Sequence, residues 1–391
     1  MADVASNIWK LKLYRFFASL MIIGGFWVPY YTQVGNVTLF QVMLLESIFV
    51  IALFLFEIPT GAIADRYGRK LSLILSSFFV CMAVFLYSLY PMFWVFFLGS
   101  MIWGLAIALY SGAAEALLYD TLKQLKREST FKMMFGRFSS YEHVAYLVAG
   151  PIGGYLASSY GLRVPMWATV VPVVIAFGIC FSLTEPRVHK KVERSYFSTM
   201  LDGIKYFRKH KVLQVLAFDR ISINLFTWIV FWMYQPLLTE RGVSLFYFGI
   251  FYSAIFGVPI LFYRNLERLE RLFGSKKKFL FFSALISSLS LILLGTFDSL
   301  VLMSILLIMY FSLNGSRFLL LINYMNKYIP SKIRATVMST MSMIESFLYA
   351  FVFLLTGVLI EWNLLMTFVL FGSFTLIATF FSGVKEEHLL D

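Results

Sequence analysis

The stretch "GAIADRYGRK", residues 61–70, gathers four charged side chains between two stretches that are almost entirely apolar. The charged residues are Asp65, Arg66, Arg69 and Lys70. Gly61 and Gly68 lie among them, and we expect both to permit a tight turn and a close approach of helices because glycine has no Cβ. The stretch therefore marks a polar loop in an otherwise apolar chain.

The composition shows what surrounds this loop. Of the 391 residues, 60% are hydrophobic and only 14% are charged, and the chain contains 43 Phe. Ordinary globular domains are about half apolar and about a quarter charged. A water-soluble protein of this composition would expose too much apolar surface, so we expect an integral membrane protein.

Twelve apolar stretches are long enough to cross a membrane, because a transmembrane helix needs about 20 such residues. They lie near 13–33, 38–60, 71–90, 92–118, 138–160 and 165–183, and near 212–238, 245–263, 279–297, 300–324, 336–360 and 364–381. The sequence therefore predicts an all-α membrane protein with twelve transmembrane helices in two halves of six.

The distribution of Lys and Arg predicts the orientation, because positively charged loops stay on the cytoplasmic side. With the N-terminus inside, the outer connections carry only Arg163 and Arg241 of the 33 Lys and Arg residues. We expect a multi-pass protein of the cell membrane with both termini in the cytoplasm. The net charge of +12 then reflects this topology and contact with anionic lipid, and gives no argument for binding nucleic acid.

A polar stretch divides the chain into two parts of similar length. We expect a six-helix half at residues 1–184, a cytoplasmic linker at 185–211 and a second six-helix half at 212–391. Met200, Leu201, Ile204 and Phe207 share one helical face, so the linker is expected to hold a helix along the membrane surface.

With this topology, "GAIADRYGRK" lies in the inner loop between the second and third helices. There it resembles the signature G-x-x-x-D-R-x-G-R-K of the major facilitator superfamily at every defined position. The resemblance implies the twelve-helix fold of that family and a latch on the inner side of the membrane. In such a latch Asp65 would face the region of Arg334, and Arg69 would pair with Asp120 or Glu115. The alternative is a positively charged loop without a partner.

Two further stretches bear on the resemblance. The equivalent loop of the second half, "RNLERLERLFGSKKKF", keeps Gly274 and Lys276 but has Arg271 where an aspartate is expected, so the internal repeat is architectural more than literal. "GPIGG", residues 150–154, is similar to the antiporter motif G-P-x-x-G of the family, although the glycines that precede that motif are missing. Export and simple close packing of small residues remain equal interpretations.

Ionisable residues inside apolar stretches are candidates for function, because charge at membrane depth is costly. Asp219 and Arg317 are expected to form a buried pair that acts either as a static strut or as part of the coupling or substrate site. Arg220 is expected to reach the membrane surface instead.

Carboxylates in these helices are candidate proton carriers. Loss of water favours the neutral form of a carboxylate, so such a group can take up and release a proton near neutral pH. The candidates are Glu46, Glu115, Asp219 and Glu345, of which Glu345 is of lower rank, together with Glu142 and His143. Hydrogen bonding between helices is the equal alternative for Glu46, and a place in the latch is the alternative for Glu115.

Aromatic and polar side chains predict the walls of a substrate cavity. Phe26, Tyr30 and Gln33 recur at helical spacing in the first helix, and Asn314, Arg317 and Tyr324 do so in the tenth. Trp228 adds to an aromatic group in the seventh. Such walls suit a hydrophobic or amphipathic compound, although aromatic residues also gather at membrane interfaces of any protein.

These observations favour a secondary transporter that works by alternating access. Proton-driven efflux of a hydrophobic or amphipathic small molecule is the leading function, with proton-coupled uptake of a small solute and a lipid scramblase or channel as alternatives. The four scattered histidines, and two cysteines without metal spacing, argue against an enzyme and against a metal site. We expect no cofactor and no nucleic acid; the partners are a small-molecule substrate, protons and membrane lipid, and the protein is expected to be a monomer.

Overall fold

The computed structural model describes residues 2–186, 196–330 and 333–389; the side chains of Ile58, Asp65, Ala335 and residues 2–3 and 196–202 lie outside this description. The described residues are almost entirely helical and contain no β-strand. They form two compact units, Met1–Val192 with Val243–Ser253 and Glu193–Gly242 with Ala254–Asp391.

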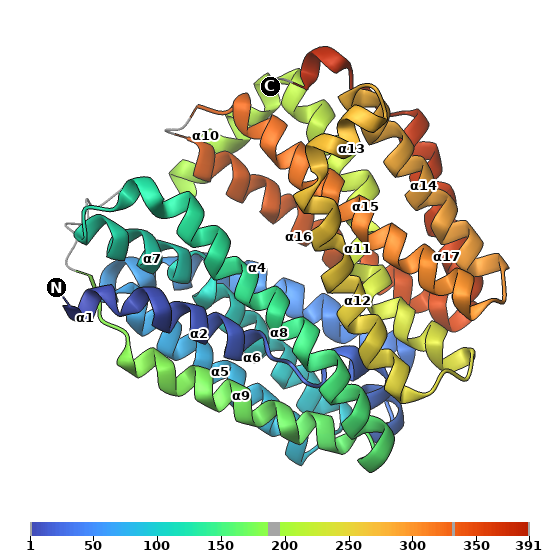
Figure 1. The fold of residues 1–391 in the computed structure, drawn as a ribbon, viewed down its shortest axis with the longest axis horizontal. Coiled ribbons are helices and arrows are strands. Elements are labelled where there is room, and N and C mark those ends of the chain that lie inside the picture. The colour runs from blue at the N-terminus through green and yellow to red at the C-terminus, as the bar shows by residue number, and fades with distance from the viewer. Residues whose placement is uncertain (1, 187–195, 331–332, 390–391) are drawn as a thin grey trace. The chain divides into compact units, whose positions relative to one another are not determined.

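In the first unit, each predicted span corresponds to one helix or to a broken helix (Figure 1). The short α1 (Ala2–Ala5) precedes them. The spans are α2 (Asn7–Ser19) with the short turns that follow it, α4 (Leu39–Tyr67), α5 (Arg69–Leu89), α6 (Phe93–Tyr110) with α7 (Ala113–Gln124), α8 (Phe131–Tyr160) and α9 (Arg163–Ser182).

The second unit repeats this arrangement. Its spans are α11 (Lys211–Glu240), α12 (Leu245–Arg264), α14 (Lys276–Thr296), α15 (Leu300–Lys327), α16 (Arg334–Trp362) and α17 (Leu364–Phe380). The first part of α12 belongs to the first unit. In the described chain, ten helical stretches are long and apolar enough to cross a membrane; α17, with 17 residues, is shorter, and α8 is not among the ten.

The packing of the helices also repeats. In the first unit α5 packs against α6 and α9, and α2 packs against α8; in the second unit α14 packs against α15 and α17, and α11 packs against α16 (Figure 1). Helices at the same position in each half therefore make corresponding contacts. The shared architecture supports the prediction of two related six-helix halves.

Helix starts are set by polar side chains that satisfy free backbone N–H groups. The Thr38 hydroxyl accepts a hydrogen bond from the Gln41 backbone at 3.2 Å, and the Gln41 side chain accepts one from the Thr38 backbone at 2.9 Å, so α4 begins with a capping box. Asn363 caps α17 by accepting from the Met366 N–H at 2.8 Å. These residues sit at the ends of apolar runs and fix where each run becomes a helix.

The first span is not one continuous helix, although the sequence predicts one. α2 ends at Ser19, and a 3₁₀ turn (Gly24–Phe26), a short helix α3 (Trp27–Pro29) and a π-helical turn (Tyr30–Val34) complete the span. Side chains at Gly24 and Gly25 would meet Tyr252, so the two glycines permit this close contact. The backbone N–H of Ile23, freed by the break, donates to the Thr169 hydroxyl at 3.0 Å.

The predicted linker contains a helix, α10 (Tyr196–Lys209), which belongs to the second unit. α10 packs against α16, and the Tyr206 hydroxyl donates to the Tyr328 carbonyl at 2.7 Å. Of the four residues expected on its apolar face, the side chains of Met200 and Leu201 lie outside the described residues, whereas Phe207 packs against the apolar core of the second unit.

The charged loop itself is very short. α4 continues through Gly61 to Tyr67, so the expectation of a turn at Gly61 is wrong, and the chain reverses at Gly68 alone. Gly68 has φ +108°, a conformation that residues with a Cβ rarely adopt. A carboxylate caps the helix that follows: the Arg69 and Lys70 N–H groups donate to Glu185 at 2.8 and 2.7 Å.

We predict that Gly68→Ala lowers the stability of the protein. The new Cβ would stand 2.9 Å from the Glu185 carboxyl group, and the positive φ adds strain of about 1–3 kcal/mol. Gly136→Ala is the control, because Gly136 lies inside α8 with nothing within 4 Å of an added Cβ, and alanine favours a helix by about 0.5–1 kcal/mol. Thermal unfolding of the purified protein measures both. A Gly68→Ala variant as stable as the Gly136→Ala variant would contradict this description of the turn.

Candidate functional site

Asp219 and Arg317 form a buried ion pair inside the second unit. The Arg317 guanidinium lies 2.6 Å from one Asp219 carboxylate oxygen, and both side chains are almost fully buried. The other carboxylate oxygen accepts from the Ser382 hydroxyl at 2.6 Å. Arg317 also donates to the Leu280 carbonyl and to the Ser283 hydroxyl.

This pair joins four parts of the second unit, namely α11, α14, α15 and the segment after α17. Both charges are neutralised and most of their hydrogen-bonding capacity is used, as a buried pair requires. The contact is the one that the sequence predicts, and of the two roles left open the geometry favours the strut.

The neighbouring Arg220 makes a separate pair. Its guanidinium is in contact with the Glu345 carboxylate of α16 and lies 5.2 Å from the centre of the Phe318 ring on α15. Only 3% of the Arg220 side chain is exposed. The expectation that Arg220 reaches the membrane surface is therefore wrong, because a carboxylate inside the unit neutralises it.

A matching pair lies in the first unit. Arg15 on α2 is in contact with Glu142 on α8 and with the Tyr110 hydroxyl at the end of α6. The guanidinium lies 5.2 Å from the centre of the Tyr110 ring and 5.6 Å from that of Phe138. The Tyr146 hydroxyl donates to the other oxygen of Glu142 at 2.7 Å.

Sequence reasoning missed Arg15 and ranked Glu142 low. Arg15 stands at the inner part of the first span, where a cation is explained by topology alone, and its partner is 127 residues away. The signal that could have found the pair is Glu-x-x-x-Tyr in the fifth span of each half: Glu142 and Tyr146 on α8, Glu345 and Tyr349 on α16.

Glu46 lies in α4 with 7% of its surface exposed. Tyr31 and Tyr87 lie close enough to interact with it electrostatically. Among the residues that the structure describes, no Lys or Arg forms an ion pair with Glu46. Its two interpretations, proton carrier and partner in a hydrogen bond between helices, both stay predictions.

The remaining proton candidate, Glu115, is exposed in the first turn of α7. α7 follows a break at Gly112, where φ is +70°, and a carboxylate near a helix N-terminus is stabilised by the backbone dipoles. Because Glu115 is exposed, its surroundings give no reason to prefer it as a proton carrier.

The predicted latch is only partly described. Asp65 lies within α4, but its side chain is outside the described residues. Arg66 is exposed, with its guanidinium 5.5 Å from the centre of the Tyr67 ring, and the Lys70 ammonium donates to the Phe181 carbonyl at 2.8 Å. Arg334 begins α16 and donates to the Ile329 carbonyl at 3.2 Å. The expected pairings of Asp65 with the region of Arg334, and of Arg69 with Asp120 or Glu115, stay predictions.

The predicted cavity residues of the first span are mostly packed inside the unit. Phe26 and Tyr30 are fully buried: Phe26 stacks on Phe248 at 6.2 Å, and the Tyr30 hydroxyl donates to the Tyr87 carbonyl at 2.7 Å. Gln33 is exposed. Because the helix breaks before them, these side chains do not form the single helical face that their spacing predicts.

The residues expected on one stripe of α15 have different surroundings. Asn314 is fully buried, and within the described residues neither atom of its amide group has a hydrogen-bond partner. Tyr324, ten residues further along, instead donates to Glu270. On α11, Trp228 is 40% exposed and stacks on Phe231. Asn314 is thus the candidate whose buried polar atoms most need a ligand or water.

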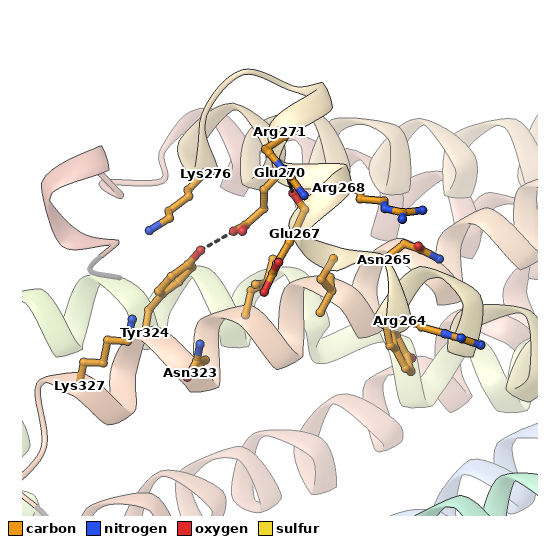
Figure 2. A pocket seen from close by; sticks show the side chains of 13 residues that line it. Arg264, Asn265, Glu267, Arg268, Glu270, Arg271, Lys276, Asn323, Tyr324 and Lys327 are labelled. Atoms are coloured by element: carbon orange, nitrogen blue, oxygen red, sulfur yellow. Dashed lines mark hydrogen bonds between the residues drawn. The ribbon is translucent and has the colours of Figure 1, made fainter. Parts of the chain in front are cut away.

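Tyr324 lines a polar cavity of about 810 Å³ beneath the short helix α13 (Leu266–Leu272). Figure 2 shows Glu270 reaching the Tyr324 hydroxyl, with Lys276 and Lys327 near the same ring. Five cationic and two anionic side chains line the cavity: Arg264, Arg268, Arg271, Lys276, Lys327, Glu267 and Glu270. The loop that lines this cavity corresponds, in the second half, to the "GAIADRYGRK" loop of the first half. In it, Arg271 donates a hydrogen bond to the Glu267 carbonyl of its own helix.

Comparison with curated proteins finds two relatives. The chain is 23% identical over 242 residues to YxaM of Bacillus subtilis, an uncharacterized MFS-type transporter, in a match that covers 57% of this chain and 56% of YxaM. It is 23% identical over 198 residues to an uncharacterized MFS-type transporter of Methanocaldococcus jannaschii, covering 49% of each. The chain thus matches about half the length of these relatives.

Solved structures share the fold over nearly the whole chain. A mutant of the nucleoside transporter NupG superimposes with a TM-score of 0.79 at 15% identity, covering 96% of this chain and 98% of that one. A D-xylose-proton symporter does so with a TM-score of 0.75 at 13% identity, covering 98% of both.

The sequence profile of the Major Facilitator Superfamily matches residues 16–269, which is more than half of the chain. The two-half helical fold and the MFS-type relatives agree with this match. The protein therefore belongs to the major facilitator superfamily, whose members are membrane transporters and not enzymes.

Proposed function

We propose that the protein is a proton-coupled secondary transporter of a hydrophobic or amphipathic small molecule, working by alternating access. The observation that carries the proposal is Glu46, a carboxylate buried in an apolar helix with no cationic partner among the described residues. An unpaired carboxylate removed from water changes its protonation state readily, as a proton carrier requires.

Of the other predicted proton candidates, Glu345 is the second choice. Asp219 is held by Arg317 and Ser382, and Glu115 is exposed. Glu345 has a single cationic partner and keeps 19% of its side chain exposed, so water can reach it.

Two directions of transport are candidates. Export in exchange for protons is supported by the antiporter-like "GPIGG" stretch, since side chains at Gly150 and Gly154 would run into the α12 backbone at Gly249 and Phe246. Such glycines allow two helices to touch along their backbones and to slide or rock on one another. Uptake together with protons is supported by the Arg–Glu pairs, which link a proton acceptor to an anion-binding group.

In this proposal the protein resides in the cell membrane as a monomer surrounded by lipid, with both termini in the cytoplasm. The concentration of Lys and Arg on the predicted inner loops supports the orientation. Nucleosides and D-xylose, the substrates in the names of the structural neighbours, are reasonable first compounds for a substrate screen, although identities of 15% and 13% carry the fold alone.

We predict that Glu46→Gln abolishes driven accumulation but not exchange. Glutamine imitates the protonated carboxyl group permanently, so substrate can bind and cross while no proton is carried. A screen of purified protein by thermal shift identifies a substrate, since a ligand of the folded state raises apparent stability. Driven uptake and exchange of that substrate are then compared in proteoliposomes at equal protein.

The matched control for this experiment is Glu128→Gln, which removes an exposed carboxylate outside the predicted spans. If the Glu46→Gln variant retains pH-driven uptake, Glu46 is excluded as the coupling site, and Glu345 becomes the next candidate. A substrate flux that ignores the pH gradient in the unaltered protein would contradict proton coupling itself.

We predict that Asp65→Asn shifts the protein towards forms that are open on the cytoplasmic side, because the latch loses its negative charge. A reporter cysteine at Ser342, an exposed position on α16, should react faster with a cytoplasmic thiol reagent in a background without Cys81 and Cys180. Glu128→Gln, which removes an exposed carboxylate outside the predicted spans, is the control. Unchanged reactivity together with normal transport would exclude the latch.

A further inference from the structure

Two clusters of the same composition occupy corresponding places in the two units. Each contains an arginine from the first span of its half, a glutamate from the fifth span and a tyrosine four residues after the glutamate. An aromatic ring from the fourth span lies against the guanidinium in each. We call Arg15, Tyr110, Glu142 and Tyr146 the first cluster, and Arg220, Phe318, Glu345 and Tyr349 the second.

The spacing along the chain supports a common origin for the two clusters. Arg15 and Glu142 are 127 residues apart, and Arg220 and Glu345 are 125 residues apart. Helix for helix, α2 and α8 in the first unit correspond to α11 and α16 in the second. The internal repeat therefore extends to the residue types at these positions, whereas the two inner loops share only their place in the fold.

An anion-binding group is built into each cluster. In both clusters the guanidinium lies 5.2 Å from the centre of an aromatic ring. The Phe318 ring of the second cluster occupies none of the N–H donors, whereas the Tyr110 hydroxyl of the first accepts a hydrogen bond from Arg15. Within the described residues, the Nε atoms of Arg15 and Arg220 are buried and have no hydrogen-bond partner. Guanidinium donors form a planar fork that suits carboxylate, sulfonate or phosphate groups.

The glutamate is the more accessible member of the second pair, and in the first pair the two side chains are equally accessible. In the second cluster 19% of the Glu345 side chain is exposed against 3% of Arg220, and in the first the two values are 22% and 21%. Removing the arginine from its aromatic ring would leave a buried positive charge without a partner. Replacing the carboxylate with another anion keeps the cluster neutral, provided that the glutamate takes up a proton.

The other groups that face the two glutamates do not compete for this proton. Glu142 is faced by Arg15 on α2, by Tyr110 on α6 and by Tyr146 on its own helix, whose ring lies 5.8 Å from that of Tyr252 on α12. His143, beside Tyr146, has its ring directed to the Ser139 carbonyl.

Glu345 is faced by Arg220 on α11 and by Tyr349 on its own helix, and the Tyr349 hydroxyl donates to the Asn224 carbonyl. Asp219, next to Arg220 in sequence, is held by Arg317. Tyrosine is uncharged and arginine is already protonated in their common forms near neutral pH, so an added proton neutralises neither. The two carboxylates are therefore the groups in direct contact with the arginines that a proton from solution can neutralise.

We propose that each cluster is a proton-dependent binding site for the anionic group of an amphipathic organic anion. A proton from solution adds to the glutamate, the Arg–Glu ion pair breaks, and the arginine forms a new ion pair with the anion of the substrate. The net charge of the cluster is zero before and after the step. Anion and proton then bind together, which selects uptake with protons over exchange. The inference rests on the proposed proton-coupled transport, specifies its substrate class and adds to Glu46 two further protonation sites, Glu142 and Glu345, which are tied to binding of the anion.

The test uses three probes of similar size with fixed charge: benzenesulfonate, benzyltrimethylammonium and benzyl alcohol. Benzenesulfonate carries no proton near neutral pH, so any proton taken up on its binding enters the protein. The full-length protein is placed in lipid nanodiscs in weak buffer. Binding at millimolar concentration is measured by thermal shift, and proton uptake by a pH-sensitive dye.

We expect the anion alone to stabilise the protein, with uptake of about one proton per bound anion and an affinity that falls up to about tenfold per unit rise in pH. Glu142→Gln with Glu345→Gln should keep anion binding, remove proton uptake and make the affinity independent of pH. Arg15→Lys with Arg220→Lys keeps the charges and should weaken binding, since lysine lacks the planar fork. Glu128→Gln should behave as the unaltered protein does.

Absence of stabilisation by benzenesulfonate, preference for the cation, or anion binding without proton uptake in the unaltered protein would each overturn the inference. These measurements involve no flux. Driven transport of another substrate, observed alongside any of these results, would leave the proposed function standing and overturn the anion site alone. If the anion site binds as expected but no gradient-driven transport is found, the anion site stands and the proposed function is overturned.

Discussion

The constraint on which the structure depends is that a charge inside an apolar environment must be neutralised close by. Taking an ion out of water costs several kcal/mol even after the protein relaxes, and leaving it unpaired costs more. Arg15, Arg220 and Arg317 each meet a carboxylate of their own unit. These contacts link α2 to α8, α11 to α16 and α11 to α15, so the same pairs that satisfy the charges also fix which helices touch.

The three pairs differ in how completely they are satisfied, and this difference separates structural from functional charge. Arg317 and Asp219 are surrounded by further donors and acceptors, from Ser382, Ser283 and the Leu280 carbonyl. The Arg–Glu clusters keep a partly exposed carboxylate, whereas a buried Nε atom without a hydrogen-bond partner within the described residues is common to Arg15, Arg220 and Arg317. Asp219 is buried and held by two partners, so that pair has little reason to open, whereas water can reach Glu142 and Glu345 and their pairs can exchange partners at lower cost. The same residue types thus serve as a strut in one place and as a candidate switch in two others.

Much of the fold can be predicted from the sequence, because transmembrane helices are long apolar runs and each run is a local property. The structure has a helix or a broken helix at each of the twelve predicted spans, and the family and fold agree with the motif. Helix breaks were not predictable in the same way: the irregular segment after Ser19 depends on contacts of Gly24 and Gly25 with Tyr252, far along the chain. The turn at Gly68 is held by Glu185, which caps the next helix. The sequence alone places Glu185 in a linker and does not reveal this contact.

The site was predicted less well, for a related reason. Spacing along one helix places Phe26 and Tyr30 on a cavity wall, but partners from other helices bury both inside the unit. Arg220 was expected at the surface because its partner Glu345 is 125 residues away, and no local pattern reveals such a contact. Asp219 and Arg317 were paired correctly because both are charges deep in apolar runs. Glu-x-x-x-Tyr occurs in α8 and α16 but also at Glu115 and Tyr119 in α7, so the pattern becomes meaningful only when an arginine is found beside the copies in α8 and α16.

The central claim is that the partly exposed glutamates of the two clusters change protonation state when the arginines change partner. Infrared difference spectroscopy reports this directly, since a carboxylate and a protonated carboxyl group absorb at different frequencies. Spectra of the protein in lipid are recorded with and without benzenesulfonate, for the unaltered chain and for the Glu142→Gln, Glu345→Gln double variant. The account predicts that a protonated carboxyl band appears and a carboxylate band disappears on binding in the unaltered chain, and that both changes are absent from the double variant. Binding without either change in the unaltered protein would contradict it.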